Sequence, residues 1–183
     1  MKKPIKLSNH ELNRYNIDTY KKIDKHPLIV VLDNVRSAIN VGSIFRTSDA
    51  FMIEKIVLCG ITACPPNKDI LKTALGATES VDWSYENDTL TYLKSIENRN
   101  NYDFICVEQA TNSIKLNDFK FHVGKKTLLI FGNEVDGVSQ AILDISDICL
   151  EIPQHGTKHS LNVAVSAGIV LWEISNKLNP KNS

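Results

Sequence analysis

The sequence predicts a single α/β domain in which helices flank a parallel β-sheet. Short β-rich runs alternate along the chain with segments of helical periodicity, a pattern typical of parallel strands joined by helical crossovers. The chain has 183 residues, of which 43% are apolar, and this is enough for one domain with a sizeable hydrophobic core.

The expected strands are short apolar runs at 28–32, 55–59, 103–108, 127–131 and 148–152. The expected helices precede, separate and follow these strands, at 10–23, 40–52, 67–75, 88–99, 138–145 and 160–178. In the second helix an apolar stripe runs along one side and is formed by Val41, Ile44, Phe45 and Met52. The other side of that helix carries Ser43, Arg46 and Asp49.

The composition gives no sign of a membrane protein or of a strongly basic one. Lys plus Arg equals Asp plus Glu at 21 each, so any basic surface for nucleic acid must be local. The candidates for such a surface are Lys2, Lys3, Lys6, Arg14, Lys21, Lys22, Lys25, Lys125 and Lys126. No apolar run approaches the ~20 residues of a membrane span, and no signal peptide is evident. We therefore expect a cytoplasmic protein with no membrane partner.

The four cysteines, Cys59, Cys64, Cys106 and Cys149, form no C-x-x-C pair and have no histidine at ligand spacing. Three of them lie in apolar runs, where buried free thiols are expected. We therefore expect neither a disulfide framework nor a metal site.

Three polar segments each follow a predicted strand, at 33–50, 132–139 and 153–162. In open α/β sheets, ligands bind beyond the carboxyl ends of the strands, so these segments predict a shared site. The middle segment has the spacing of a phosphate-binding loop, but Val138 stands where that motif needs its lysine. This argues against nucleotide hydrolysis, and no G-x-G-x-x-G motif follows any strand.

Several polar residues of these segments have an ordinary explanation beside a functional one. Asn40 and Arg46 lie on the half of the second helix away from its apolar stripe. Arg46 would either form an ion pair with a surface acid such as Asp49 or serve a site at the sheet edge. Ser160 and Asn162 precede the last helix, where they either cap its first turn or belong to a binding site.

Three motifs occur in order along the chain. They read N-V-R-S-A-I-N-V-G-S-I-F-R-T-S-D-A at 34–50, F-G-N-E-V-D-G-V-S within 130–139, and I-P-Q-H-G-T-K-H-S-L-N-V-A-V-S-A-G within 152–173. Together they resemble the SpoU (TrmH-type) RNA ribose methyltransferases of the SPOUT superfamily. We therefore expect a helical N-terminal extension at 1–26, a SpoU-type methyltransferase domain at 27–178, and a C-terminal tail at 179–183.

The resemblance implies a parallel α/β domain whose C-terminal segment threads through a loop as a deep trefoil knot. General rules of chain topology would not predict a knot, because true knots are rare. The family holds S-adenosylmethionine in the knot and methylates the ribose 2′-hydroxyl of RNA, which implies tRNA or rRNA as the substrate here. By position, the donor-binding groups would come from Glu108, Gln109, Phe131, Gly132, Ile152, Ser160, Leu161 and Asn162.

The resemblance also implies a catalytic set, formed by Arg46, Asn40, Glu134, Ser160 and Asn162. Because an ordinary arginine is almost always protonated, we expect Arg46 to stabilise charge at the reacting hydroxyl rather than to act as the base. Asn40 and Glu134 would orient Arg46 or the substrate, although Glu134 could also be an ordinary loop carboxylate. His155 and His159 match no motif position and stay outside this set, although an unperturbed imidazole titrates near ~6.5.

The resemblance further implies a homodimer with a site shared between subunits, because family members pack their knot-region helices together. On the last helix, Ala164, Ala167, Gly168 and Leu171 share one face at three- and four-residue spacing. That face would form either the subunit contact or the packing against the protein's own sheet. The alternative to an enzyme is a non-catalytic RNA-binding or assembly protein that retains the fold.

Overall fold

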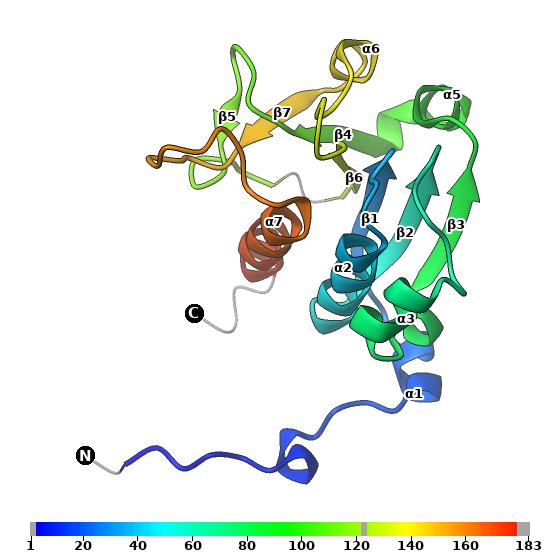
Figure 1. The fold of residues 1–183 in the computed structure, drawn as a ribbon, viewed down its shortest axis with the longest axis vertical. Helices are drawn as coiled ribbons and strands as arrows, with labels where there is room; N and C mark the ends of the chain where they lie inside the picture. The colour runs from blue at the N-terminus through cyan, green and yellow to red at the C-terminus, as the bar shows by residue number, and fades with distance from the viewer. Residues whose placement is uncertain (1–2, 122–123, 179–183) are drawn as a thin grey trace.

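The computed structural model describes residues 3–121 and 124–178. At its centre lies a seven-stranded sheet in the order β3-β2-β1-β6-β4-β7-β5, and all neighbouring strands are parallel (Figure 1). The strands are β1 (His26–Asp33), β2 (Ile53–Cys59), β3 (Asp82–Glu86), β4 (Tyr102–Val107), β5 (Ile114–Lys115), β6 (Lys126–Phe131) and β7 (Ile148–Glu151). The predicted parallel α/β fold is confirmed.

Helices cover both faces of this sheet. One face carries α2 (Ala38–Ala50), α3 (Lys68–Ala74), α4 (Ala77–Ser80) and α7 (Val163–Leu178), and the other carries α5 (Thr89–Ser95) and α6 (Gln140–Leu143). Helices α2 and α7 lie side by side (Figure 1). The remaining helical segments are α1 (Ile17–Lys22) and two short 3-10 turns, η1 (Asn9–Leu12) and η2 (Arg99–Asn101).

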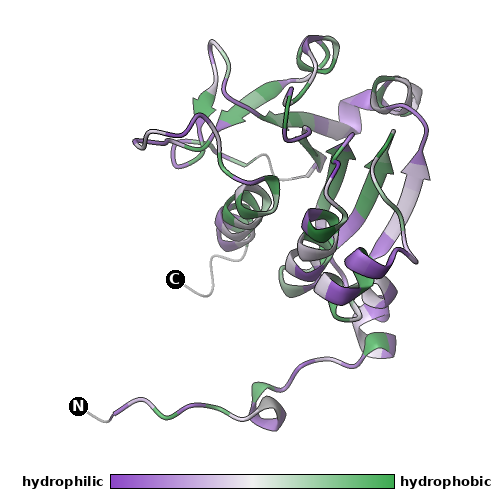
Figure 2. Cartoon of the chain, in the orientation of Figure 1, coloured by the Kyte–Doolittle hydropathy of each residue, from purple (hydrophilic) through white to green (hydrophobic). Residues whose placement is uncertain are grey.

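Strand β1 occupies the middle of the sheet and is buried on both sides. Leu28, Val30 and Leu32 point into the core under α2 and α7. Ile29 and Val31 point into the core under α5 and α6. A strand covered on both faces needs a continuous apolar run, and Figure 2 shows the central strands in the hydrophobic colour.

Two strands, β3 and β5, were not predicted from the sequence, because their hydrophobic patterns are weak. In β3, Trp83 and Tyr85 alternate with polar residues on an exposed edge strand, so the apolar run seen in β1 and β2 is missing. Strand β5 has only two residues, both exposed, at the opposite edge of the sheet. Edge strands of this kind carry little hydrophobic signal, since only part of one face is buried.

The helices exist where they were predicted, but several are shorter. The helix expected at 10–23 is divided: η1 ends next to Asn13, whose φ of 48° is left-handed, and α1 then begins at Ile17. The helix expected from residue 160 begins at Val163, since the preceding residues remain in a loop. The predicted tail at 179–183 lies outside the described residues.

Helix α2 follows β1 directly and brings the first motif to the carboxyl end of the sheet. Ser37 caps it, because its Oγ accepts a hydrogen bond from the Asn40 amide at 3.3 Å. Val41, Ile44 and Phe45 are fully buried, as the predicted stripe requires. Met52 falls beyond the helix, in a turn with a φ of 53°.

The segment before β1 attaches to the domain only near its end. Tyr20 of α1 is buried, and its hydroxyl donates a hydrogen bond to the Asp49 carbonyl oxygen at 2.9 Å. Residues 3–16 then run away from the domain (Figure 1). Ile5, Leu7 and Tyr15 are 89%, 56% and 60% exposed, so this stretch adds nothing to the core.

Candidate active site

A cavity of about 570 Å³ lies beyond the carboxyl ends of β4, β6 and β7. Loops that follow these three neighbouring strands form its walls, so the parallel sheet itself brings distant segments together. All eight residues predicted to bind the donor line this cavity, namely Glu108, Gln109, Phe131, Gly132, Ile152, Ser160, Leu161 and Asn162. Glu134 lines it as well.

The turn after β6 has a backbone shape that requires glycine. A Cβ atom on Gly132 would lie 2.0 Å from the carbonyl carbon of Gly137, so no larger residue fits without moving the turn. Asn133 closes the turn, since its Oδ1 accepts hydrogen bonds from the amides of Val135 and Asp136, each at 2.9 Å. The turn thereby presents Glu134 at the rim of the cavity.

The loop after β4 is joined to both other loops. The Glu108 carboxylate accepts hydrogen bonds from the Val138 amide at 3.0 Å and from the Gln109 amide at 2.8 Å. The Gln109 side chain donates to the carbonyl oxygen of His159 at 2.6 Å. The cavity walls are therefore connected by hydrogen bonds as well as by the sheet.

The Glu134 carboxylate receives three hydrogen bonds from the start of the first motif. The Arg36 amide donates to Oε2 at 3.0 Å, and the Ser37 amide and the Asn40 side chain donate to Oε1 at 3.2 and 2.9 Å. Partial burial raises the pKa of Glu134, but these hydrogen bonds outweigh it and hold the pKa below its ordinary value. The carboxylate is therefore ionised at neutral pH.

Asn40 and Asn162 extend this network to the last helix. The side-chain Nδ2 of Asn162 donates a hydrogen bond to Asn40 Oδ1 at 3.1 Å, across 122 residues of sequence. Asn162 Oδ1 also accepts from the amides of Ala164 and Val165 at 2.9 and 3.3 Å, so it caps α7 while lining the cavity. The capping role and a role in the site are therefore compatible for this residue.

Arg46 is the member of the predicted catalytic set that lies apart. It is exposed on α2 and does not line the cavity. Within the described residues no ion pair joins it to Asp49, whose carboxylate instead accepts a hydrogen bond from Ser80. Its guanidinium is thus available to a substrate, or to a site formed with a second copy of the chain.

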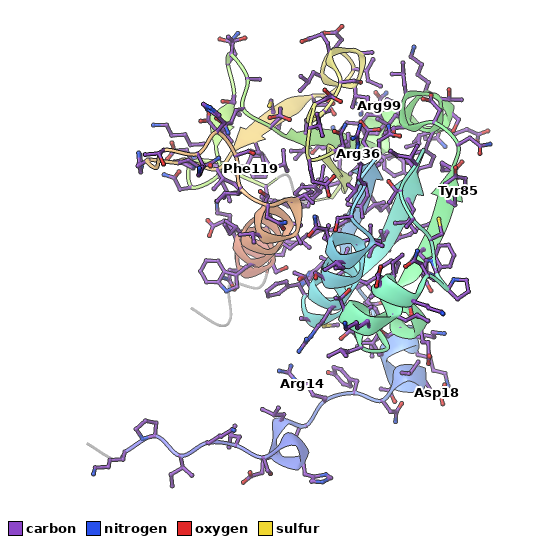
Figure 3. All side chains as sticks on the ribbon, in the orientation of Figure 1. Arg14, Asp18, Arg36, Tyr85, Arg99 and Phe119 are labelled. Carbon is purple, nitrogen blue, oxygen red and sulfur yellow. The ribbon has the colours of Figure 1, made fainter. Side chains whose placement is uncertain are left out.

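Some residues at the site were not predicted. Arg36 and Ser37 contribute backbone amides, and a backbone donor cannot be recognised from the residue type. Figure 3 labels Arg36 near the carboxyl ends of the central strands, above α2. Asn133 shapes the turn through its side-chain oxygen. An asparagine shortly after a strand and before a glycine is typical of a turn, and this pattern could have identified it from the sequence. His159, left out of the catalytic set, lines the cavity but is exposed.

All four cysteines are free thiols, and burial raises the pKa of both Cys59 and Cys106 to about 12. Across residues 3–121 and 124–178, no group of three or more His, Cys, Asp or Glu side chains could hold a metal ion. In the same part of the chain, no helix is long and apolar enough to cross a membrane.

A parallel sheet with a polar cavity formed by the loops after three adjacent strands defines an α/β protein that binds a ligand at the carboxyl edge of its sheet. The model of the SpoU rRNA Methylase family matches residues 27–172. The chain belongs to this family, and its class is therefore that of RNA methyltransferases.

Named relatives agree with this assignment. An uncharacterised tRNA/rRNA methyltransferase of Borreliella burgdorferi is 34% identical over 171 residues, which cover 89% of this chain and 69% of the relative. The 23S rRNA (guanosine-2′-O-)-methyltransferase RlmB of Vibrio parahaemolyticus is 27% identical over 163 residues. That match covers 89% of this chain but 64% of RlmB, so the chain spans somewhat less than two thirds of that relative.

Solved structures share the fold. The A. aeolicus TrmH/SpoU tRNA modifying enzyme superimposes with a TM-score of 0.77 at 28% identity, and the match covers 91% of this chain and 82% of that one. The SpoU methyltransferase AviRb from Streptomyces viridochromogenes, in complex with AdoMet, gives a TM-score of 0.75 at 24% identity, covering 87% and 61%.

Proposed function

We propose that this protein is an S-adenosylmethionine-dependent methyltransferase that modifies ribose 2′-hydroxyl groups of tRNA or rRNA. The observation that carries the proposal is the convergence of all eight expected donor residues on one cavity, with Glu134, Asn40 and Asn162 joined by hydrogen bonds at its rim. Family membership supports the same reaction class.

The cavity suits the donor in size and chemistry. A volume of about 570 Å³ lies within the usual range for cofactor sites. Ile152 and Leu161 offer apolar walls for an adenine ring, and the backbone of the Gly132 turn can approach closely because no Cβ intervenes. When bound, S-adenosylmethionine supplies a methyl group on a positively charged sulfur.

The residues of the chain would then position the acceptor and stabilise charge. The ionised Glu134 carboxylate holds the Asn40 side chain and the loop before α2 in place. Arg46 would stabilise the negative charge that develops on the 2′-oxygen as the hydroxyl proton passes to solvent water, since a guanidinium stays protonated at neutral pH. Positioning and electrostatic stabilisation, rather than a strong base, account for the rate.

We propose a homodimer in which α7 contacts the partner subunit. The contact face differs from the face of small residues that the sequence suggested. Of the four residues expected at the contact, Ala167 and Leu171 are fully buried in the protein's own core. The outward side of α7 instead exposes Val165, Ile169 and Trp172 by 50%, 37% and 54%, at four- and three-residue spacing. Ile39 on neighbouring α2 is 54% exposed.

A second copy on this face would also explain the position of Arg46. Arg46 lies on α2, beside α7, but does not line the cavity of its own chain. A subunit packed against α2 and α7 could bring its cavity to this guanidinium. The composite site therefore belongs to the proposal together with the dimer.

Charge is divided unevenly along the chain, which bears on how RNA binds. The first 25 residues hold seven Lys or Arg and three Asp or Glu, a net +4, whereas the remainder holds 14 and 18, a net −4. The proposed RNA surface therefore includes the extension at 1–26 beside the domain at 27–178, because phosphates bind where positive charge is local. We further propose a trefoil knot formed by the cavity loops, and a cytoplasmic location.

The direct test is methyl transfer from labelled S-adenosylmethionine to total RNA from cells that lack the modification. Labelled methyl groups recovered in alkali-resistant dinucleotides support the proposal, because a 2′-O-methyl group blocks alkaline cleavage at that ribose. Donor binding by calorimetry without methylation of any RNA pool would instead favour the non-catalytic RNA-binding or assembly protein.

A further inference from the structure

The loop between β1 and α2, residues 34–37, holds Glu134 through two consecutive amides. The Arg36 and Ser37 amides each donate to one carboxylate oxygen. This arrangement requires both N–H groups to point to the same side, so the loop must keep one conformation. Any contact that fixes the loop 34–37 therefore also fixes the positions of Glu134 and its partner Asn40.

The loop is held from its other side by the turn after β2. The Val35 amide donates to Thr62 Oγ1 at 3.0 Å, and the same hydroxyl donates to the Leu32 carbonyl oxygen at 3.1 Å. The Ile61 amide donates to Asn34 Oδ1 at 3.1 Å. These contacts join the ends of the neighbouring strands β1 and β2 to each other.

Burial makes the Thr62 contact hard to replace. Thr62 is 3% exposed and Val35 is 0% exposed, so water cannot take over the hydrogen bonds of the hydroxyl. A hydroxyl can accept from Val35 and donate to Leu32 at once, whereas an isosteric methyl group can do neither. Thr62 lies outside all three sequence motifs, 72 residues before Glu134.

We propose that Thr62 is a positioning residue for the methyl-transfer site: its hydroxyl fixes the loop 34–37 and thereby the direction of Glu134 and Asn40. This inference rests on the proposed function for its kinetic consequence. Thr62 is buried and does not line the cavity. Its loss should therefore impair the reaction and leave donor binding intact.

The test compares Thr62→Val with Thr62→Ser in the full chain. Thr62→Val should lower kcat at saturating donor and RNA on the order of 10- to 100-fold, as expected for misplacement of a reacting group. Its Kd for S-adenosylmethionine should not change. Thr62→Ser keeps the hydroxyl and should restore kcat close to wild type.

A second readout does not depend on activity. The hydrogen bonds from the loop help to lower the pKa of Glu134, so a displaced loop should raise that pKa in Thr62→Val and not in Thr62→Ser. A carbon-detected NMR titration of the Glu134 carboxyl measures this directly. If the wild type methylates no RNA, the proposed function fails, and this titration alone decides the role of Thr62.

Ser48→Ala is the matched control. Ser48 lies on α2, its hydroxyl is buried, and it has no hydrogen-bond partner among the described residues, so its removal should change neither readout. The proposal would be overturned by wild-type kcat and Glu134 pKa in Thr62→Val, by equal impairment of the serine and valine variants, or by the same loss in Ser48→Ala. A fall in donor affinity that matches the fall in kcat would also overturn it.

Discussion

At the scale of single residues, the site depends on side chains that serve structure and chemistry together. Asn162 caps α7, lines the cavity and donates to Asn40. Glu134 accepts three hydrogen bonds that the unfolded chain cannot provide. Arg46, by contrast, makes no side-chain ion pair or hydrogen bond among the described residues, so its replacement should separate its proposed catalytic role from folding.

Arg46→Ala is expected to leave donor binding unchanged and to lower methylation on the order of 100- to 1000-fold, as when one charge-stabilising donor is removed from a reaction centre. Calorimetry with S-adenosylmethionine and a methylation assay on the same preparation measure the two effects. A folded Arg46→Ala protein that no longer binds the donor would contradict this division of roles.

The ionised state of Glu134 should make stability depend on pH. Its pKa is lowered in the folded protein, so its hydrogen bonds stabilise the fold fully above the ordinary value of 4.5, and this contribution is lost as pH falls through the lower folded pKa. Denaturant titrations of wild type and Glu134→Gln, from neutral pH to about pH 3, should therefore converge at the acidic end. A difference that stays constant over the whole range would exclude this source of stability.

At the scale of elements, the position of α2 controls the site, because α2 carries Asn40 and follows the loop that holds Glu134. Gly42 lets α2 approach α3 closely: a Cβ there would lie 2.4 Å from the Ile70 carbonyl oxygen. The backbone of α3 cannot move aside as a flexible side chain could. Close packing of these two helices is therefore a condition for the geometry of the site.

Gly42→Ala is expected to destabilise the protein by about 1–3 kcal/mol, the usual cost of overpacking. It should also lower methylation, because a displaced α2 would move Asn40 at the site. Gly168→Ala is the matched control, because Gly168 also lies in a helix but an added Cβ meets no atom of its own chain within 4 Å. That change should be neutral or stabilise by up to about 1 kcal/mol through helix propensity. Equal destabilisation of both variants in denaturant titrations would argue against the α2 to α3 contact as the cause.

At the scale of the whole molecule, the outward face of α7 and the isolated position of Arg46 are the two features that support the proposed dimer. Exposed apolar residues at helical spacing are typical of a subunit contact when they form a contiguous strip. The extension before β1 adds positive charge to a domain that is otherwise acidic. The apolar face of α7 and the basic segment before β1 are both exposed to solvent in the single chain.

Ile169→Asp together with Trp172→Asp should dissociate the dimer and abolish methylation in parallel, because two charges would be buried without partners. Leu71→Asp, at a residue 44% exposed on α3, is the control and should affect neither property. Sedimentation velocity and the RNA assay provide the readouts. A wild-type protein that is monomeric at assay concentration and fully active would rule out a composite site.

Mixing inactive subunits tests the composite site more directly. Arg46→Ala retains an intact cavity, whereas Gly132→Ala should lose it through the clash with Gly137. If Arg46 serves the partner's cavity, mixed dimers regain one complete site and activity returns on mixing. Activity that stays absent in demonstrably mixed dimers would place Arg46 in the site of its own chain.

The sequence by itself determined the fold class, five of the seven strands and the family. These features depend on patterns that are local or ordered along the chain, such as the apolar run of β1, the stripe of Val41, Ile44 and Phe45, and the three motifs. The edge strands β3 and β5 were missed, because their residues are largely exposed and carry little hydrophobic pattern.

Only the tertiary structure decided which groups meet at the site and which surfaces stay open. The amide of Arg36 reaches Glu134 across 98 residues, and Val35 reaches Thr62 across 27, through backbone and hydroxyl groups that no motif spacing encodes. The face of α7 that is buried could not be read from small residues alone, because Ala167 fits a core as well as a subunit contact. Hydrogen bonds and packing between distant segments depend on how the sheet orders its strands, and that order exists only in the folded chain.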